Sequence, residues 1–97
     1  MATIAILDLQ LKAGSLETAH KVIHATLTDT RAFPGCLSVT VLIDSDDPVH
    51  VVVYEIWESI ERDRAYRAWR ATPEGASALG SILAARKLTQ FTVAEGI

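Results

Sequence analysis

The most strand-like segment of the chain is Val49-His50-Val51-Val52-Val53-Tyr54-Glu55-Ile56-Trp57-Glu58-Ser59. Valine, tyrosine, isoleucine and tryptophan fit a pleated, packed surface, so a β-strand is expected here. Its alternate residues form two faces, one with Val49, Val51, Val53, Glu55 and Trp57 and one with His50, Val52, Tyr54 and Ile56. Because both faces are largely apolar, we expect the strand to be covered on both sides.

Alternating and helical patterns flank this strand on both sides. The first half of the chain predicts a strand over residues 3–12, a helix from Leu16 to about Arg31 and a strand over residues 36–44. The composition of residues 44–48 predicts a turn, which would join the second and third strands as a hairpin. After Trp57 a helix is expected from Ser59 to about Arg70. Thr72-Pro73-Glu74 would then restart a helix, and a last strand is expected over residues 87–93.

The element order β-α-β-β-α-β predicts one α+β domain over residues 1–97. The expected fold is ferredoxin-like, a four-stranded antiparallel sheet with helices on one face. Ile4 and Ile6 would then lie on the second, uncovered face, together with the His50 face of the central strand. A second copy of the sheet is the simplest cover, so we expect a homodimer with Asp8, His50 and Tyr54 on the partner side.

Composition excludes several classes of protein. Of the 97 residues, 49% are hydrophobic and 22% charged, and the net charge of −3 argues against nucleic-acid binding. No apolar run approaches a membrane span of about 20 residues, and no signal segment opens the chain, so a cytoplasmic location is expected. Cys36 is the single cysteine, which leaves no intrachain disulfide. The acidic turn lacks the spacing of a calcium loop, and no metal site is expected.

Four landmarks together resemble the antibiotic biosynthesis monooxygenase family. They are Phe33-Pro34-Gly35-Cys36-Leu37, Asp46-Asp47-Pro48, the run from Val53 to Ser59, and Thr72-Pro73-Glu74. The resemblance implies a dimeric α+β barrel with a cavity between helices and sheet in each subunit. Its members include cofactor-independent oxygenases of hydroxylated aromatics, quinol oxygenases and haem-degrading enzymes.

The resemblance also implies roles for particular positions. Trp57 matches the tryptophan that closes the third strand and lines the cavity. Haem-degrading relatives pair it with an asparagine, where this chain has Leu7, and with a histidine on the next helix. Counted from Trp57 that histidine position falls at Arg67, and counted from Thr72-Pro73 it falls at Trp69. Haem degradation is therefore disfavoured, with Tyr66 as the one remaining candidate ligand in this helix, and no cofactor is expected.

Oxygenation of a phenol without a cofactor requires a base, a dry cavity and donors for negative charge. His20, at the edge of the apolar stripe of the first helix, is the predicted base, with water as the alternative. Trp57 and Arg67 are predicted to act with it, as a stacking wall and an anion partner. The predicted substrate-binding residues are Leu7, Arg64, Tyr66 and Trp69. For all of these, simple packing or exposed helix charge is the competing interpretation.

The predicted function is a monooxygenase that acts on a hydroxylated aromatic or quinol-type small molecule. A non-catalytic module of the same fold that binds a hydrophobic small molecule is the alternative.

Overall fold

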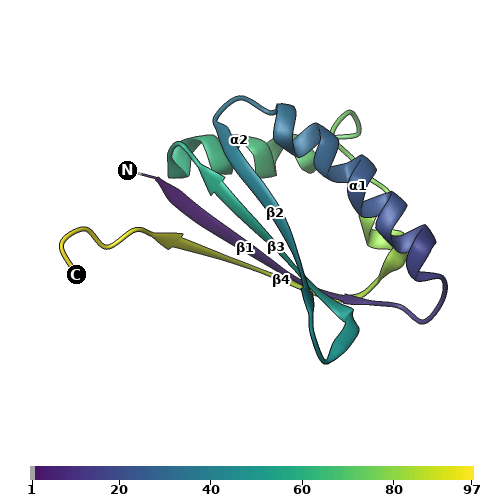
Figure 1. Cartoon of the computed structure of the whole chain (residues 1–97). Coiled ribbons are helices and arrows are strands. Elements are labelled where there is room, and N and C mark those ends of the chain that lie inside the picture. The colour runs from purple at the N-terminus through teal and green to yellow at the C-terminus, as the bar shows by residue number, and fades with distance from the viewer. Residues whose placement is uncertain (1) are drawn as a thin grey trace.

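The computed structural model describes residues 2–97 as a four-stranded antiparallel sheet with the helices on one face (Figure 1). The elements in chain order are β1 (Thr3–Leu11), α1 (Leu16–Ala32), β2 (Cys36–Asp44), β3 (Asp47–Trp57), α2 (Ile60–Arg70), the 3-10 helix η1 (Leu79–Ile82) and β4 (Leu83–Thr92). The strand order is β2-β3-β1-β4, with every neighbouring pair antiparallel. The ferredoxin-like fold expected from the sequence is confirmed.

The alternation of the central strands sorts their side chains as predicted. Val51, Val53 and Trp57 of β3 lie on the helix side, where each is at most 1% exposed. Register pairs Val51 with Leu9 and Val53 with Leu7, so the two strands present one continuous surface to the helices. Helix α1 packs Ala19, Ile23 and Leu27 onto it. Hydrophobic burial on this one face is the main stabilising contribution to the fold.

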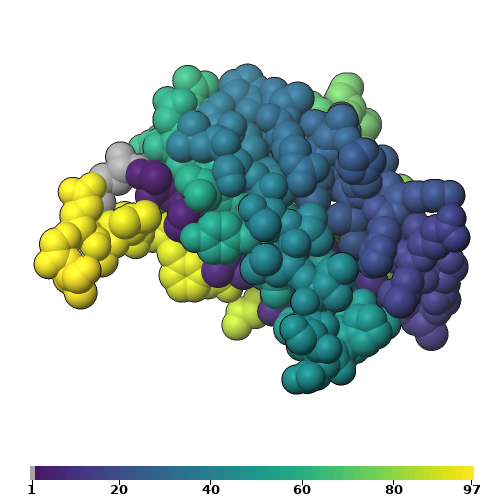
Figure 2. All heavy atoms as spheres, viewed as in Figure 1, coloured from purple at the N-terminus to yellow at the C-terminus, as the bar shows by residue number. Residues whose placement is uncertain are grey.

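The second face of the sheet is left open by this arrangement. Ile4, Ile6, Val52, Tyr54 and Ile56 are only partly buried there. Leu42 and Phe91 are each 48% exposed on the outer strands. Figure 2 shows the last residues of the chain, in yellow, projecting from the body of the molecule.

An ion cluster lies on this open face. The two ring nitrogens of His50 contact carboxylates on both sides, Nδ1 with Asp44 Oδ2 at 2.8 Å and Nε2 with Asp8 Oδ1 at 3.1 Å. The hydrogen bond to Asp44, followed by that to Asp8, raises the pKa of His50 above its ordinary value. The same contact with His50 lowers the pKa of Asp44. Both ring nitrogens can donate only in the imidazolium form, so the cluster selects the charged histidine.

In the second half of the chain one predicted element is wrong, and the start of the last predicted strand is misplaced. Thr72-Pro73-Glu74 does not restart a helix, because the Thr72 hydroxyl donates to the Trp69 carbonyl at 2.6 Å and accepts from the Gly75 amide at 3.2 Å. These bonds fold the backbone into turns, an alternative that threonine side chains offer to helix. Strand β4 begins at Leu83 rather than Lys87, since a register shift at Leu11 extends its pairing with β1.

No helix within residues 2–97 is long and apolar enough to cross a lipid bilayer.

Candidate functional site

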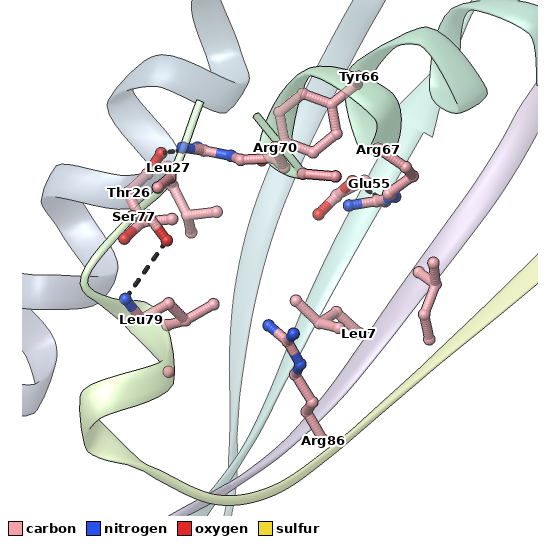
Figure 3. A pocket seen from close by; sticks show the side chains of 14 residues that line it. Leu7, Thr26, Leu27, Glu55, Tyr66, Arg67, Arg70, Ser77, Leu79 and Arg86 are labelled. Carbon is pink, nitrogen blue, oxygen red and sulfur yellow. Dashed lines mark hydrogen bonds and ion pairs between the residues drawn. The ribbon is translucent and has the colours of Figure 1, made fainter. Parts of the chain in front are cut away.

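A cavity of about 550 Å³ lies between the helices and the sheet (Figure 3). Its apolar lining comes from β1, α1, η1, β4 and the segments between them: Leu7, Leu27, Ala71, Ala76, Leu79, Gly80 and Leu88. Its polar lining is formed by Thr26, Glu55, Tyr66, Arg67, Arg70, Ser77 and Arg86. The volume falls in the range of small-molecule sites, and an apolar cavity with a few converging polar groups is typical of them.

A buried carboxylate lies on the wall of this cavity. Glu55 is 1% exposed because its position on β3 faces the helices. Its Oε1 accepts from Trp57 Nε1 at 2.9 Å and from an Arg67 terminal nitrogen at 2.7 Å. Among residues 2–97 both of its hydrogen bonds end on Oε1, so Oε2 is the carboxylate oxygen left for a ligand.

Arg67 also contacts a second buried carboxylate, on its own helix. Asp63, four residues earlier in α2, is 0% exposed and places Oδ1 3.0 Å from Arg67 Nε. That contact is an ion pair without hydrogen-bond alignment. The other oxygen of Asp63 accepts from Gln90 Nε2 of β4 at 2.6 Å. The cluster Glu55–Asp63–Arg67 thus holds two carboxylates and one guanidinium, a net charge of −1 largely shielded from water.

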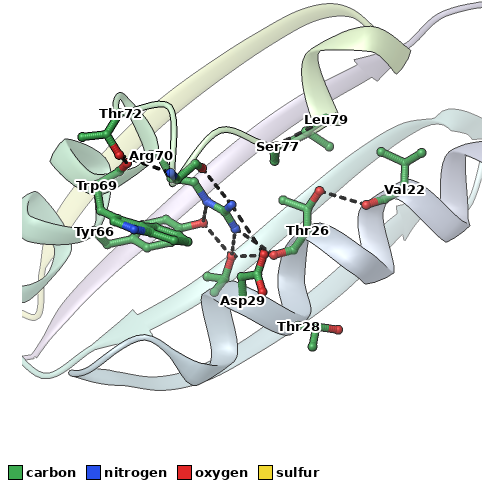
Figure 4. Close-up of polar contacts among 12 residues, drawn as sticks. Val22, Thr26, Thr28, Asp29, Tyr66, Trp69, Arg70, Thr72, Ser77 and Leu79 are labelled. Carbon is green, nitrogen blue, oxygen red and sulfur yellow. Dashed lines mark hydrogen bonds and ion pairs between the residues drawn. The ribbon is translucent and has the colours of Figure 1, made fainter.

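Arg70 is fixed at the other side of α2 by neutral acceptors (Figure 4). Its Nε donates to Tyr66 Oη at 2.7 Å, and its terminal nitrogens donate to the carbonyls of Thr26 at 2.8 Å and Gly75 at 3.1 Å. The nearest carboxylate is that of Asp29, 3.9 Å away and 61% exposed. The positive charge of Arg70 is therefore held in place at the cavity with only a weak counter-charge.

Tyr66 joins the cavity to α1. Its hydroxyl lies 2.6 Å from Thr30 Oγ1, and both residues are buried. Its ring lies under the guanidinium groups of Arg67 and Arg70, at 4.8 and 5.1 Å from the ring centroid. Cations at such distances interact favourably with the face of an aromatic ring. The tyrosine therefore orients both arginines.

Trp57 lies behind the cavity wall. It is 0% exposed and packs against Tyr66 and Phe33, with ring centroids 5.0 and 6.2 Å apart. The predicted stacking wall is thus a core tryptophan that donates its N–H to Glu55. Trp69 lies further out, 5.4 Å from Phe33 and 6.2 Å from Tyr66.

The structure brings together Leu7, Tyr66 and Arg67 of the predicted site residues, since all three line the cavity. Arg64 lies on the exposed side of α2. His20 lies at a separate hollow of about 250 Å³ between α1 and the β2–β3 hairpin, together with His24, Arg31 and Ile43. The helical stripe predicted that His20 lies near the sheet, but it could not distinguish between the two hollows that border α1.

Sequence reasoning missed Glu55, Arg70 and Arg86. Glu55 carried a usable signal, because it is the one charged residue on a strand face that is otherwise Val49, Val51, Val53 and Trp57. A charge at such a position is rarely buried unless it is paired. Within residues 2–97, no group of three or more histidine, cysteine, aspartate or glutamate side chains is arranged to hold a metal ion.

The sequence model of the antibiotic biosynthesis monooxygenase family matches residues 3–78. The chain belongs to this family. No curated protein matches it by sequence.

Solved structures show the same fold at low sequence identity. SnoaB, a cofactor-independent oxygenase from Streptomyces nogalater, superposes with a TM-score of 0.81 and 20% identity over 99% of this chain and 96% of SnoaB. A point mutant of SnoaB gives a TM-score of 0.83 and 18% identity over the same shares of the two chains. Rv0793 from Mycobacterium tuberculosis gives 0.78 and 18% identity over 98% of this chain and 97% of that chain.

Proposed function

We propose that this protein is an oxygenase that oxidises a hydroxylated aromatic or quinol-type molecule in the 550 Å³ cavity without a metal or flavin. The observation that carries the proposal is the buried Glu55–Arg67 pair on the wall of a mainly apolar cavity. The family membership and the similarity to a cofactor-independent oxygenase, SnoaB, support it.

Glu55 is the proposed acceptor of the substrate proton, in place of His20. Its Oε2 has no hydrogen-bond partner within residues 2–97, whereas its Oε1 is held by Trp57 and Arg67. The substrate O–H bond breaks, its proton bonds to Oε2, and the electron pair stays on the substrate oxygen. The carboxylate is held by two donors behind the cavity wall, so Oε2 is oriented for the substrate before it binds.

The remaining polar groups stabilise the anion that forms. The fixed guanidinium groups of Arg67 and Arg70 lie on the cavity wall, and donors held in place before the reaction stabilise developing charge effectively. The electron-rich anion then reduces O2. One oxygen atom enters the ring, the other leaves as water, and a phenol with O2 gives a quinone with water. The substrate supplies all the electrons, so no external reductant is needed.

The apolar residues orient the substrate and exclude water. Leu7 and Tyr66, both predicted to bind substrate, would contact its ring from the sheet and from α2. Trp57 acts as a positioning residue, because its N–H fixes the Glu55 carboxylate from behind. Trp69 acts only through its packing on Tyr66.

Oxygen uptake in chelator-treated buffer tests the proposal, with hydroxylated naphthalenes as substrates and autoxidation without protein subtracted. We expect Glu55→Gln to lower the rate by about a hundredfold or more, the usual contribution of a positioned base. Glu61→Gln, an exposed change on α2, is the matched control and should keep the rate. Protein-dependent uptake that survives Glu55→Gln would refute the role of Glu55. Saturable binding without any uptake would instead support the non-catalytic binding module.

We further propose that two copies pack through their open sheet faces. The supporting observation is the partly exposed apolar surface formed by Ile6, Val52, Tyr54 and Ile56, which is large for a monomer to leave in water. Light scattering during gel filtration should give twice the mass of the chain. Tyr54→Glu should shift the protein to a monomer, and a wild-type monomer at all concentrations would exclude the dimer.

A further inference from the structure

The side chain of Arg86 points into the cavity, across from the Glu55–Arg67 pair (Figure 3). It lies on β4, where register places it beside Leu9 on the helix side of the sheet. Figure 3 shows its guanidinium group rising from β4 between Leu7 and Leu79, with Glu55 and Arg67 across the cavity. The cavity therefore has a polar group at each end and leucines between them.

Among residues 2–97, no side chain neutralises the charge of Arg86. The carboxylates beside the cavity are engaged by other cations, Glu55 and Asp63 by Arg67. No ion pair of residues 2–97 includes Arg86. The lining as a whole contains three arginines and one carboxylate. A ligand that fills the cavity therefore meets an excess of positive charge at the Arg86 end.

We infer that the substrate carries a carboxylate opposite its reacting hydroxyl, and that Arg86 is the residue that selects it. This inference rests on the proposed function for the orientation of the ring, with the hydroxyl at Glu55. A guanidinium group presents a planar fork of donors that matches a carboxylate in two parallel hydrogen bonds. A ligand ring held between Leu7 and Leu79 would displace water from one side of that fork, which strengthens the attraction compared with open water.

The two ends also define which molecules are rejected. A neutral aromatic leaves Arg86 without a counter-charge when its ring displaces water from the guanidinium group, and it gains only the apolar contacts. A carboxylate placed at the other end would lie beside the buried carboxylate of Glu55, with the Arg67 guanidinium already engaged by Glu55 and Asp63. Arg86 therefore determines both which aromatics bind and in which direction they lie.

Calorimetric titration with a hydroxynaphthoic acid and its carboxamide tests this inference, because the two probes differ in charge and hardly in shape. We expect the wild-type protein to bind the acid about tenfold more tightly, a modest value for a charge-assisted hydrogen bond, because Arg86 is exposed in the unliganded protein. The preference should weaken with added salt. Arg86→Gln should bring the ratio to about one while leaving carboxamide affinity within about twofold.

Lys87→Gln is the matched control. Lys87 follows Arg86 in β4, lies opposite Asp8 in the strand register and points to the open face of the sheet. It should keep the wild-type ratio. An unchanged ratio in Arg86→Gln, or no saturable binding of either probe, overturns the inference. Oxygen uptake measured in parallel separates this result from the proposed function. Selective binding without oxygen uptake would refute only the proposed oxygenation. Oxygen uptake with no preference for the acid would refute only the proposed role of Arg86.

Discussion

Arg67→Met tests whether one guanidinium group holds two buried carboxylates in the fold. The substitution keeps an unbranched apolar stem and removes the charge that lies 2.7 Å from Glu55 and 3.0 Å from Asp63. Removing one partner of a buried ion pair costs about 3–5 kcal/mol because the other charge is left uncompensated. The Arg67 side chain is 24% exposed, so water relieves part of this cost. We expect a loss of about 3 kcal/mol in the free energy of unfolding at neutral pH.

Urea unfolding at one fixed protein concentration, followed by circular dichroism, measures this loss. Arg64→Met makes the same change on the exposed side of α2 and should stay within about 0.5 kcal/mol of the wild type. Adding Glu55→Gln and Asp63→Asn to Arg67→Met should recover most of the stability. Equal stability of the Arg67→Met and Arg64→Met variants, or no recovery when Glu55→Gln and Asp63→Asn are added, would refute the description of the cluster.

Three further predictions concern stability. Tyr66→Phe removes a hydroxyl that lies 2.6 Å from Thr30 and should cost about 1–2 kcal/mol in urea unfolding, since buried partners lose a hydrogen bond. An unchanged urea midpoint in Tyr66→Phe would contradict this prediction. Gly35→Ala should cost at least about 1 kcal/mol, because φ is +91° and an added Cβ would lie 2.5 Å from Arg62 Cγ. The pKa of His50 is raised in the fold, so its contribution is complete below its ordinary pKa of 6.5 and is lost as pH rises through the folded value. Wild-type stability should therefore fall between about pH 6 and pH 9 by more than that of His50→Gln, and parallel profiles would contradict this.

Strand periodicity made most of the fold predictable. A period of two assigned Val51, Val53 and Trp57 to the covered face and Tyr54 to the open one, because a shift by one residue would reverse every side chain. The misassigned segment, residues 72–78, follows a local hydrogen bond from Thr72 to Trp69 that propensity rules do not weigh. The sequence signal there, a capping residue followed by proline, is real, but the side chain caps the end of α2 instead of a new helix.

The candidate site was less predictable because its parts meet only through tertiary packing. Arg70 finds its acceptors on Thr26 and Thr30, more than 39 residues earlier in the chain. Arg86 reaches the cavity because β4 pairs with β1 from the far end of the sequence. Arg67 lines the cavity because its helix position follows Trp57 closely, and its role in the reaction stays a prediction. His20 was favoured because histidine can act as a base near neutral pH. That property does not indicate which cavity the side chain borders.

The buried cluster Glu55–Asp63–Arg67 is the strongest argument that the cavity serves a reaction. Three apolar residues of similar size at these positions would stabilise the fold at least as well, because desolvation offsets most of the attraction in a buried ion group. A cluster with unequal charges is poorer still, since one carboxylate lacks a full partner. Polar groups that converge on a mainly apolar cavity are typical of functional sites. Here the cluster with one excess carboxylate lies on a cavity wall. Opposite it lies Arg86, whose positive charge has no ion-pair partner among residues 2–97 (Figure 3). A hydroxylated aromatic acid would match both groups. Its hydroxyl can give a proton to the Glu55–Asp63–Arg67 cluster, and its carboxylate can pair with Arg86.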